Sequence, residues 1–259
     1  MKKIAIYGKG GIGKSTTTAN ISAALGEMRY KVMQIGCDPK ADSTSMLMNG
    51  RPVPTILDTL RNSDVEASLA DMVFRGFGGV LCAECGGPTP GVGCAGRGII
   101  ASFEKLEALN AYEIYKPDVV FYDVLGDVVC GGFAMPLRRG YAKEVYIVTS
   151  GEKMSLFAAR NIAKAVEQFK GRGYAQLKGI ILNARGVANE SEMVKRAAQE
   201  MGIEVVAEIP RDPTIQACED ENMTVIEGAP DSDLAKTYRK LAQKIMNTPL
   251  LISPRWNSP

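Results

Sequence analysis

The stretch GKGGIGKST, residues 8–16, follows the apolar run at residues 4–7 and fits two phosphate-binding patterns at once. It contains G-x-G-x-x-G, the dinucleotide fingerprint, and G-x-x-x-x-G-K-[ST], the P-loop. The dinucleotide pattern gives no role to Lys14 and Ser15, and it requires an acidic residue at the end of the second strand, where Cys37 stands instead. We therefore interpret the stretch as a P-loop.

A P-loop holds phosphate through the backbone N–H groups of the loop and of the helix that follows it. We expect Lys14 to neutralise the outer phosphate oxygens and Ser15 to bind Mg²⁺. The predicted nucleotide contacts in this stretch are Gly8, Lys9, Gly10, Gly11, Ile12, Gly13, Lys14, Ser15 and Thr16.

Short apolar runs alternate with helical patterns along the rest of the chain. Strands are expected at residues 4–7, 31–35, 118–123, 144–149, 178–182 and 204–209, and helices at 14–28, 153–170, 190–201 and 231–246. Continuous apolar strands between helices predict an α/β fold, with a mainly parallel sheet covered by helices on both faces. We expect one domain over residues 1–259, in which the glycine-rich residues 76–98 form a long loop.

The composition excludes several classes of function. Hydrophobic residues make up 46% of the chain, and 31 basic residues balance 29 acidic ones without a basic block, so nucleic acid is not an expected partner. The first strand starts at Lys2 and no apolar run reaches membrane length, so we expect a cytoplasmic protein without a signal peptide or a membrane contact. The absence of histidine excludes Ser-His-Asp and Cys-His catalysis.

Two groups of aspartates follow predicted strands. Asp38 and Asp42 come directly after the second strand, and Asp123 and Asp127 follow the strand at residues 118–123. The segment that starts at Asp123 has the D-x-x-G form of a switch II segment, with the aspartate near Mg²⁺. Because the chain has no histidine, we expect Asp38 to orient or activate the attacking water. A helix N-cap is a serious alternative for Asp42.

Lys9 is a second lysine within a loop whose pattern requires only Lys14. The sequence K-G-G-x-G-K-[ST] resembles the deviant Walker A loop of the signature-lysine ATPases. In that family the extra lysine reaches across a homodimer to the nucleotide of the other subunit. The resemblance therefore implies a homodimer with two facing nucleotide sites.

Two of the six cysteines, Cys94 and Cys130, are flanked by glycines that let backbone N–H groups approach the sulfur atoms. This setting suits an iron–sulfur cluster, and two thiolates per chain supply four ligands at the two-fold axis of a dimer. Cys82-x-x-Cys85 is a rival metal or redox pair. A zinc site from Cys82, Cys85, Cys94 and one further cysteine also fits the spacing. A packed thiol is the expected role of Cys218 and the favoured alternative for Cys85.

Four segments together resemble the nitrogenase iron protein family, which includes the ATP-dependent reductase subunits of nitrogenase-like systems. They are GKGGIGKSTTT, IGCDPKADST, GGPTPGVGCAGRG and YDVLGDVVCGGFAMP. The resemblance implies a homodimer with one [4Fe–4S] cluster, bridged by Cys94 and Cys130 of both subunits, and with MgATP in each subunit. It also implies that hydrolysis drives one-electron transfer into a separate catalytic component, with ferredoxin or flavodoxin as the electron donor.

The resemblance assigns further residues. It places the adenine pocket at Asn183, Pro210, Arg211, Asp212 and Gln216. Arg97, three residues after Cys94, is expected to dock the catalytic component, and the family resemblance implies that it can be ADP-ribosylated.

Two other functions share the loop. A metal or iron–sulfur cluster carrier ATPase would use the Cys82-x-x-Cys85 pair at a dimer interface. A partitioning ATPase would need a membrane-binding helix or a basic face, and the last 20 residues show neither. The substrate of the catalytic component, whether dinitrogen, a tetrapyrrole or an organosulfur compound, is not specified by this chain.

Overall fold

The computed structural model describes residues 1–62, 67–87, 95–124, 126, 136–137, 140–170 and 175–248. Its strands are β1 (Lys2–Tyr7), β2 (Val32–Gly36), β3 (Phe74–Arg75), β4 (Leu81–Glu84), β5 (Val119–Asp123), β6 (Glu144–Thr149), β7 (Gln176–Asn183) and β8 (Val205–Ile209). Within the described residues they form one sheet in the order β3-β4-β2-β5-β1-β6-β7-β8. All neighbours are parallel except β3, which runs antiparallel to β4 at the edge.

Along the chain, the helices lie between these strands or follow β8. They are α1 (Lys14–Glu27), α2 (Ile56–Asn62), α3 (Ala95–Ala108), α4 (Ala111–Tyr115), α5 (Lys153–Lys170), α6 (Glu190–Glu200), α7 (Pro213–Asp220), α8 (Val225–Gly228) and α9 (Asp233–Asn247). Short 3₁₀ turns cover Ser45–Met48, Leu69–Asp71 and Phe77–Gly79. No helix in the described part of the chain is long and apolar enough to cross a membrane.

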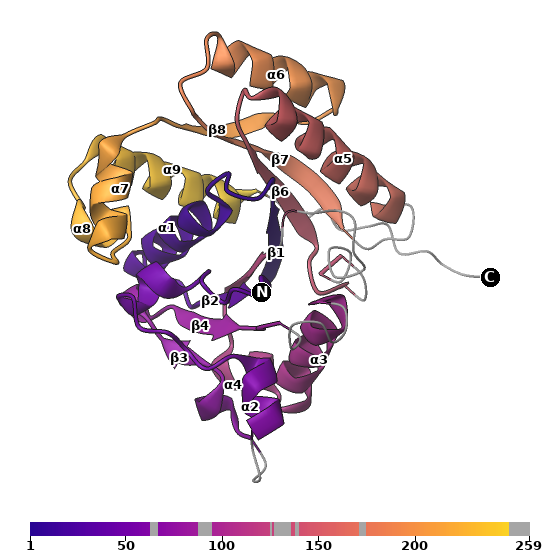
Figure 1. The fold of residues 1–259 in the computed structure, drawn as a ribbon, viewed down its shortest axis with the longest axis vertical. Coiled ribbons are helices and arrows are strands. Elements are labelled where there is room, and N and C mark those ends of the chain that lie inside the picture. Colours follow the sequence, from indigo (N-terminus) through magenta and orange to yellow (C-terminus); the bar gives the residue numbers. More distant parts are fainter. Residues whose placement is uncertain are drawn as a thin grey trace.

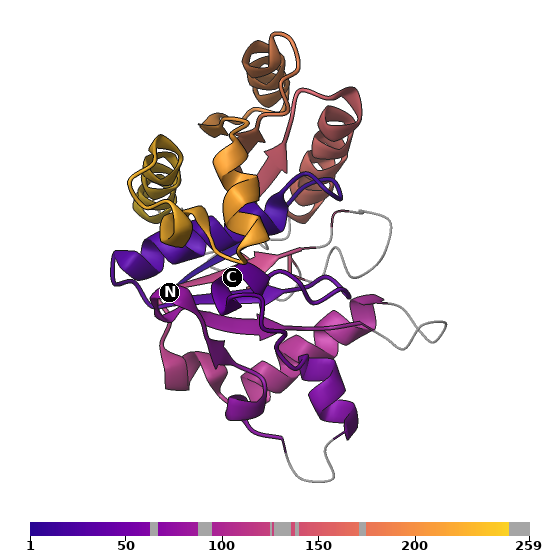
Figure 2. The same ribbon diagram turned by 60° about the vertical axis from the view of Figure 1, so that its left-hand side comes forward.

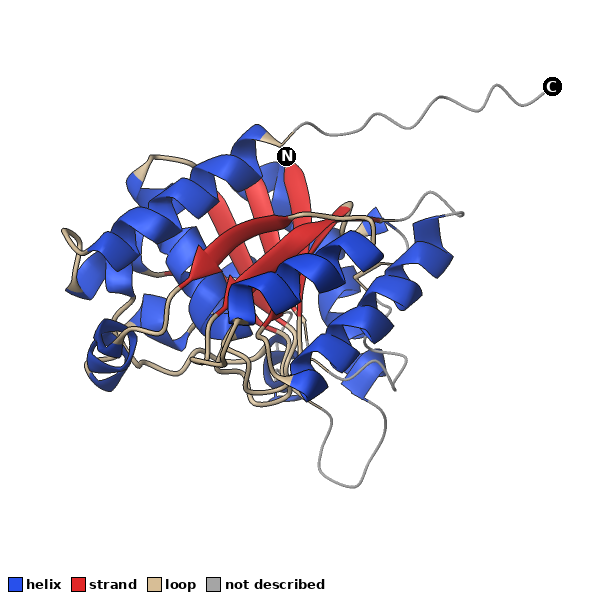
Figure 3. Ribbon diagram, turned by 90° about the horizontal axis from the view of Figure 1, so that it is seen from above, coloured by secondary structure: helices blue, strands red, loops and turns tan. Residues whose placement is uncertain are grey.

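The sheet separates two hydrophobic cores, and Figure 3 shows helices on both sides of its strands. In β1, Ile4 and Ile6 face the core built by α1, α8 and α9, whereas Ala5 and Tyr7 face the core built by α3, α5 and α6. Figure 2 shows α1 in indigo lying beside the yellow α9, and these two helices pack together. Both faces of the central strands are therefore buried, which explains their continuous apolar sequences.

The predicted α/β fold and its predicted strands and helices are confirmed, with one correction. Residues 76–98 are predicted to form a long loop, but Leu81–Glu84 forms β4, which pairs in parallel with β2, and Ala95 already begins α3. All four residues of β4 are buried, although the segment ends in a glutamate and is bounded by glycines. The partner strand and the cores on both faces decide this strand, because its own short sequence has little preference for it.

The carboxyl ends of the parallel strands bring distant segments together (Figure 1). The glycine loop follows β1, the Asp38 segment follows β2, Asp123 ends β5, and Asn183 ends β7. β1 lies between β5 and β6 in the sheet. Strands β2 to β5 lie on one side of β1 and strands β6 to β8 lie on the other, so the strand order reverses at β1. Open parallel sheets bind ligands at the carboxyl edge beside such a reversal of strand order.

Candidate functional site

The glycine loop leads directly into α1 and turns its N-terminal N–H groups toward an open cleft of 1110 Å³. Gly13 has the left-handed φ of 91°, and a Cβ there would lie 2.5 Å from Nδ2 of Asn183. That same Nδ2 donates to the carbonyl of Ile12 at 2.8 Å. Gly13 is therefore required both by the turn and by the close approach of Asn183 to the loop.

Asp123 ends β5 with 3% of the residue exposed, and it lies near Lys14 and Ser15 without itself lining the cleft. Burial raises its pKa, while nearby Lys14 and hydrogen bonding with Ser15 and Ser43 oppose that rise. Its Oδ1 atom is buried without a hydrogen-bond partner in the described structure. An unpaired carboxylate oxygen beside Lys14 and Ser15 fits a hydrated Mg²⁺ ion, which retains waters and takes few protein ligands.

Gly126 lies directly against the backbone of the glycine loop. A Cβ at this position would overlap the carbonyl of Gly8 and would lie 2.8 Å from the nitrogen of Gly10. No side chain larger than that of glycine fits between the two segments. The segment after Asp123 therefore starts in backbone contact with the loop that is predicted to hold phosphate.

The segment after β2 supplies Asp38, Lys40 and Asp42 to the cleft. Asp38 is half-buried, and its Oδ1 accepts the N–H of Lys40 at 3.0 Å. Asp42 is exposed, and the following 3₁₀ turn has Thr44 rather than Asp42 at its N-cap position. The alternative role of Asp42 as an N-cap is therefore wrong, and its carboxylate faces the cleft.

The far side of the cleft contains Asn183, Arg211, Asp212 and Gln216 from the predicted adenine pocket. Asp212 also caps α7, since its Oδ1 accepts the N–H of Thr214 at 2.8 Å, and these hydrogen bonds lower its pKa. Pro210, which precedes Arg211, is exposed and is not one of the residues that line the cleft.

Several residues of the cleft were not predicted from the sequence. Nη2 of Arg185 donates to the carbonyl of Gly11 at 2.7 Å, and Oγ1 of Thr16 donates to Oε1 of Glu219 at 2.7 Å. Lys40 and Tyr238 also line the cleft. The position of Arg185, two residues after Asn183, could have identified it from the sequence. Glu219 and Tyr238 reach the cleft only through the packing of α7 and α9, which the sequence does not show.

Cys94, Cys130 and Asp127 lie outside the described residues, so their predicted roles stay predictions. Arg97 is exposed in the first turn of α3. Within the described ranges no cluster of three or more cysteine, aspartate or glutamate side chains is arranged to hold a metal ion.

The Cys82-x-x-Cys85 interpretation is wrong. Cys82 packs into the core of α1 and α9, whereas Cys85 packs into the core on the opposite face of the sheet. Three residues along a strand place two side chains on opposite faces, so the pair cannot share a metal ion or form a disulfide. Both thiols are fully buried, and burial raises the pKa of Cys82 to about 12. Cys218 is also buried, as expected for a packed thiol.

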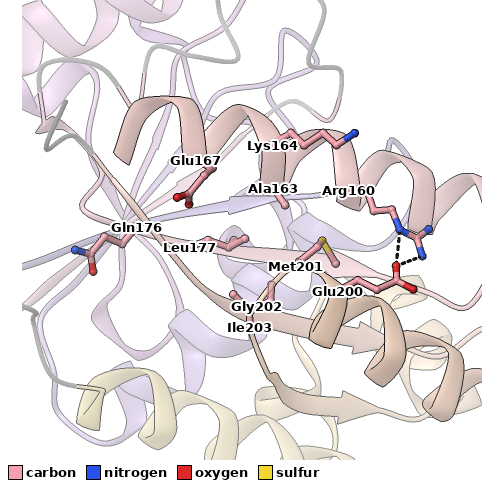
Figure 4. Close-up of a pocket in the computed structure, with 10 residues that line it drawn as sticks. All are labelled: Arg160, Ala163, Lys164, Glu167, Gln176, Leu177, Glu200, Met201, Gly202 and Ile203. Atoms are coloured by element: carbon pink, nitrogen blue, oxygen red, sulfur yellow. Dashed lines mark hydrogen bonds and ion pairs between the residues drawn. The ribbon is translucent and has the colours of Figure 1, made fainter. Parts of the chain in front are cut away.

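A second cavity of 570 Å³ lies between α5, β7 and the end of α6, away from the glycine loop (Figure 4). Arg160 and Glu200 pair across it at 2.8 Å, and Leu177, Met201 and Ile203 contribute apolar surface. It contains none of the residues of the predicted motifs. The phosphate-loop cleft is therefore the candidate functional site.

Comparison with known proteins decides the family. The family model described as 4Fe-4S iron sulfur cluster binding proteins, NifH/frxC family, matches residues 2–258. The chain belongs to this family. A nitrogenase iron protein from Methanospirillum hungatei JF-1 is 55% identical over 258 residues, which cover 98% of this chain and 91% of that protein. The predicted family resemblance is confirmed, and the homology supports the role of a reductase component.

Superposition on solved structures also confirms the fold class. The cell division ATPase MinD of Pyrococcus furiosus superposes with a TM-score of 0.71 at 27% identity, over 95% of this chain and 98% of that one. The septum site-determining protein MinD of Pyrococcus horikoshii OT3, complexed with Mg-ADP, gives the same TM-score and identity over 95% and 96% of the two chains. The NifH/frxC family member thus shares the fold of P-loop ATPases.

The position of Asp123 predicts a defect in the use of Mg²⁺. Asp123→Asn keeps the size of the side chain but removes the charge, so Mg²⁺-dependent nucleotide affinity should fall by roughly 10- to 100-fold. Binding of ADP in EDTA should change much less. Titration calorimetry with and without Mg²⁺ measures both affinities.

Asp118→Asn is the matched control, because Asp118 lies beside the opposite end of β5 and accepts the N–H of Lys31 at 2.8 Å. This variant should retain the Mg²⁺ dependence of the parent protein. An unchanged Mg²⁺ dependence in Asp123→Asn would contradict the assignment of the buried carboxylate.

Proposed function

We propose that this chain is the MgATP-dependent reductase component of a nitrogenase or nitrogenase-like system. In this proposal ATP hydrolysis in each subunit of a homodimer controls one-electron transfer to a separate catalytic component. A [4Fe–4S] cluster bridging the two subunits through Cys94 and Cys130 would carry the electron, supplied by a low-potential donor such as ferredoxin or flavodoxin. Membership of the NifH/frxC family supports the reductase role and the use of both cofactors.

The contact between Gly126 and the glycine loop is the observation that carries the proposal. Gly126 follows Asp123 by three residues and precedes Cys130 by four, so one short segment links the Mg²⁺ site to a proposed cluster ligand. Loss of the outer phosphate would change what the glycine loop holds and would release or shift the segment in contact with it. The bound nucleotide would thereby influence the position of Cys130, which belongs to the same segment.

The side chains of the cleft have separate tasks in hydrolysis. Lys14 neutralises the outer phosphate oxygens, and Ser15 holds Mg²⁺ with the assistance of Asp123. Asp38 orients the attacking water from the edge of the cleft. Lys9 is exposed, as a residue must be if it is to reach the nucleotide of a partner subunit. It would stabilise the charge that develops on the transferred phosphate.

The nucleotide base would occupy the part of the cleft lined by Asn183, Arg211 and Gln216. Arg97 is our candidate for docking, since a guanidinium can bind the carboxylates of a catalytic component in a bidentate manner. Its exposed position at the start of α3 supports this role. The substrate of that catalytic component is outside the proposal.

The two alternative functions lose support. A carrier with a paired-cysteine interface is disfavoured because Cys82 and Cys85 are buried on opposite faces of the sheet. A partitioning ATPase shares the fold, but it would leave Cys94 and Cys130 without a function.

The two lysines of the loop should give different defects. Lys14→Ala should abolish nucleotide binding, because Lys14 is the lysine that contacts phosphate within its own subunit. Lys9→Ala should retain much of the binding but lose hydrolysis by roughly 10³-fold or more, as for the removal of an arginine finger. Nucleotide titration and phosphate release measure the two effects. Equal losses of affinity in both variants would argue against a role for Lys9 across the dimer.

The cluster assignment predicts which cysteines hold iron. Cys94→Ser and Cys130→Ser should each abolish the cluster, whereas Cys85→Ser and Cys218→Ala should retain it, since those thiols are packed in the cores. Protein purified without oxygen should contain about four irons per dimer, with a visible absorption that dithionite bleaches. Full iron loading of Cys130→Ser would contradict the proposal, and quantitative transfer of the cluster to an acceptor protein would favour a carrier.

A further inference from the structure

Glu84 is a buried carboxylate that none of the roles above uses. It ends β4 with no part of the residue exposed, and within the described residues no lysine or arginine forms an ion pair with it. Burial raises its pKa to about 7, and the negative charges of Asp123 and Asp42 add to this effect. A buried acid is costly unless its hydrogen bonds compensate, so its contacts indicate what it does.

The sheet register places Glu84 in line with the Mg²⁺ site. Gly36 of β2 pairs with Glu84 of β4 on one side and with Asp123 of β5 on the other. Residues paired in this way stand on the same face of a parallel sheet, so Gly36 leaves an open slot between two carboxylates. A Cβ at Gly36 would overlap the carboxylate of Glu84 and would lie 2.7 Å from Cβ of Ser43.

The segment after β2 folds back into this slot. Ser43 and Thr44 are each 1% exposed, and both the N–H and the hydroxyl of Thr44 donate to Oε1 of Glu84 at 2.7 Å. Ser43 is one of the polar neighbours that lower the pKa of Asp123, and its carbonyl and hydroxyl accept from Nε2 of Gln34 at 2.9 and 3.0 Å. Buried side chains from three neighbouring strands therefore fix the end of the segment that carries Asp38 and Asp42.

We propose that Glu84 is a positioning residue for ATP hydrolysis. By holding Thr44, it keeps the neighbouring Ser43 over Gly36 and Asp38 at the edge of the cleft. The segment cannot leave the cleft without breaking both contacts between Thr44 and Glu84. This inference rests on the proposed function, because it assigns Glu84 to the hydrolysis carried out at that site.

The test compares turnover with nucleotide affinity. Glu84→Ala removes the acceptor, and a displacement of the segment by about 1 Å should lower the kcat for ATP by roughly tenfold or more. The KM and the affinity for ADP in EDTA should change less, because the glycine loop is untouched. Glu84→Gln keeps an oxygen that can accept both bonds from Thr44, so its kcat should stay within about threefold of the parent value.

Thr44→Val provides a second route if Glu84→Ala fails to fold. It removes the hydroxyl but keeps the N–H, so it should lower kcat by less than Glu84→Ala does. The double variant should be no slower than Glu84→Ala alone, because both substitutions break the same contact.

Glu144→Gln is the control for a general loss of stability. Glu144 is also a buried carboxylate, but it begins β6 and its Oε1 lies 3.7 Å from Nζ of Lys2 at the start of β1. It is therefore at the amino-terminal ends of the strands, opposite the glycine loop. This variant should change thermal unfolding while leaving kcat at the parent value.

Three results would overturn the proposal. One is a kcat in both Glu84→Ala and Thr44→Val within twofold of the parent value. Another is an equal defect in Glu84→Gln and Glu84→Ala. The third is a fall of kcat in Glu144→Gln that matches the one in Glu84→Ala, which would make the effect one of stability. Absence of ATP hydrolysis by the parent protein, with its cluster and partner present, would instead refute the proposed function on which the inference rests.

Discussion

The contact of Gly126 with the backbone of Gly8 and Gly10 is the constraint on which the rest of the site depends. It requires glycine at position 126 and brings the segment after β5 against the loop that follows β1. Backbone atoms meet backbone atoms in this contact, and interfaces this closely packed shift between discrete arrangements and deform little. In the proposed function, a change in what the loop holds is passed through this contact to the segment after Asp123.

Near this contact, a buried polar network holds the segments that follow β2 and β5. Asp123 has a buried unpaired oxygen, Ser43 lies over Gly36 between Asp123 and Glu84, and Thr44 donates to Glu84. Burying two carboxylates costs stability, and hydrogen bonds with fixed partners offset part of that cost. The carboxyl ends of these strands thus position both the proposed Mg²⁺ site and the segment that carries Asp38.

Much of the fold and part of the site could be predicted from the sequence. The central strands are apolar on both faces, and Lys14 and Ser15 decide between the two phosphate-binding patterns that the glycine spacing fits. β4 was missed because its four residues carry little preference of their own, and the separation of Cys82 from Cys85 depends on that strand. Arg185 and Glu219 could not be assigned to the cleft, since their contacts with the loop arise from packing between elements far apart in the sequence.

The central claim, that nucleotide bound at the glycine loop acts on the proposed cluster through the segment after Asp123, is tested most directly by the midpoint potential of the cluster. The potential is measured by redox titration of the protein alone, with MgATP, and with ATP in EDTA. Our account predicts that MgATP shifts the potential, that ATP without Mg²⁺ shifts it less, and that Lys14→Ala shows no shift. An identical potential under all three conditions in the parent protein would contradict the account.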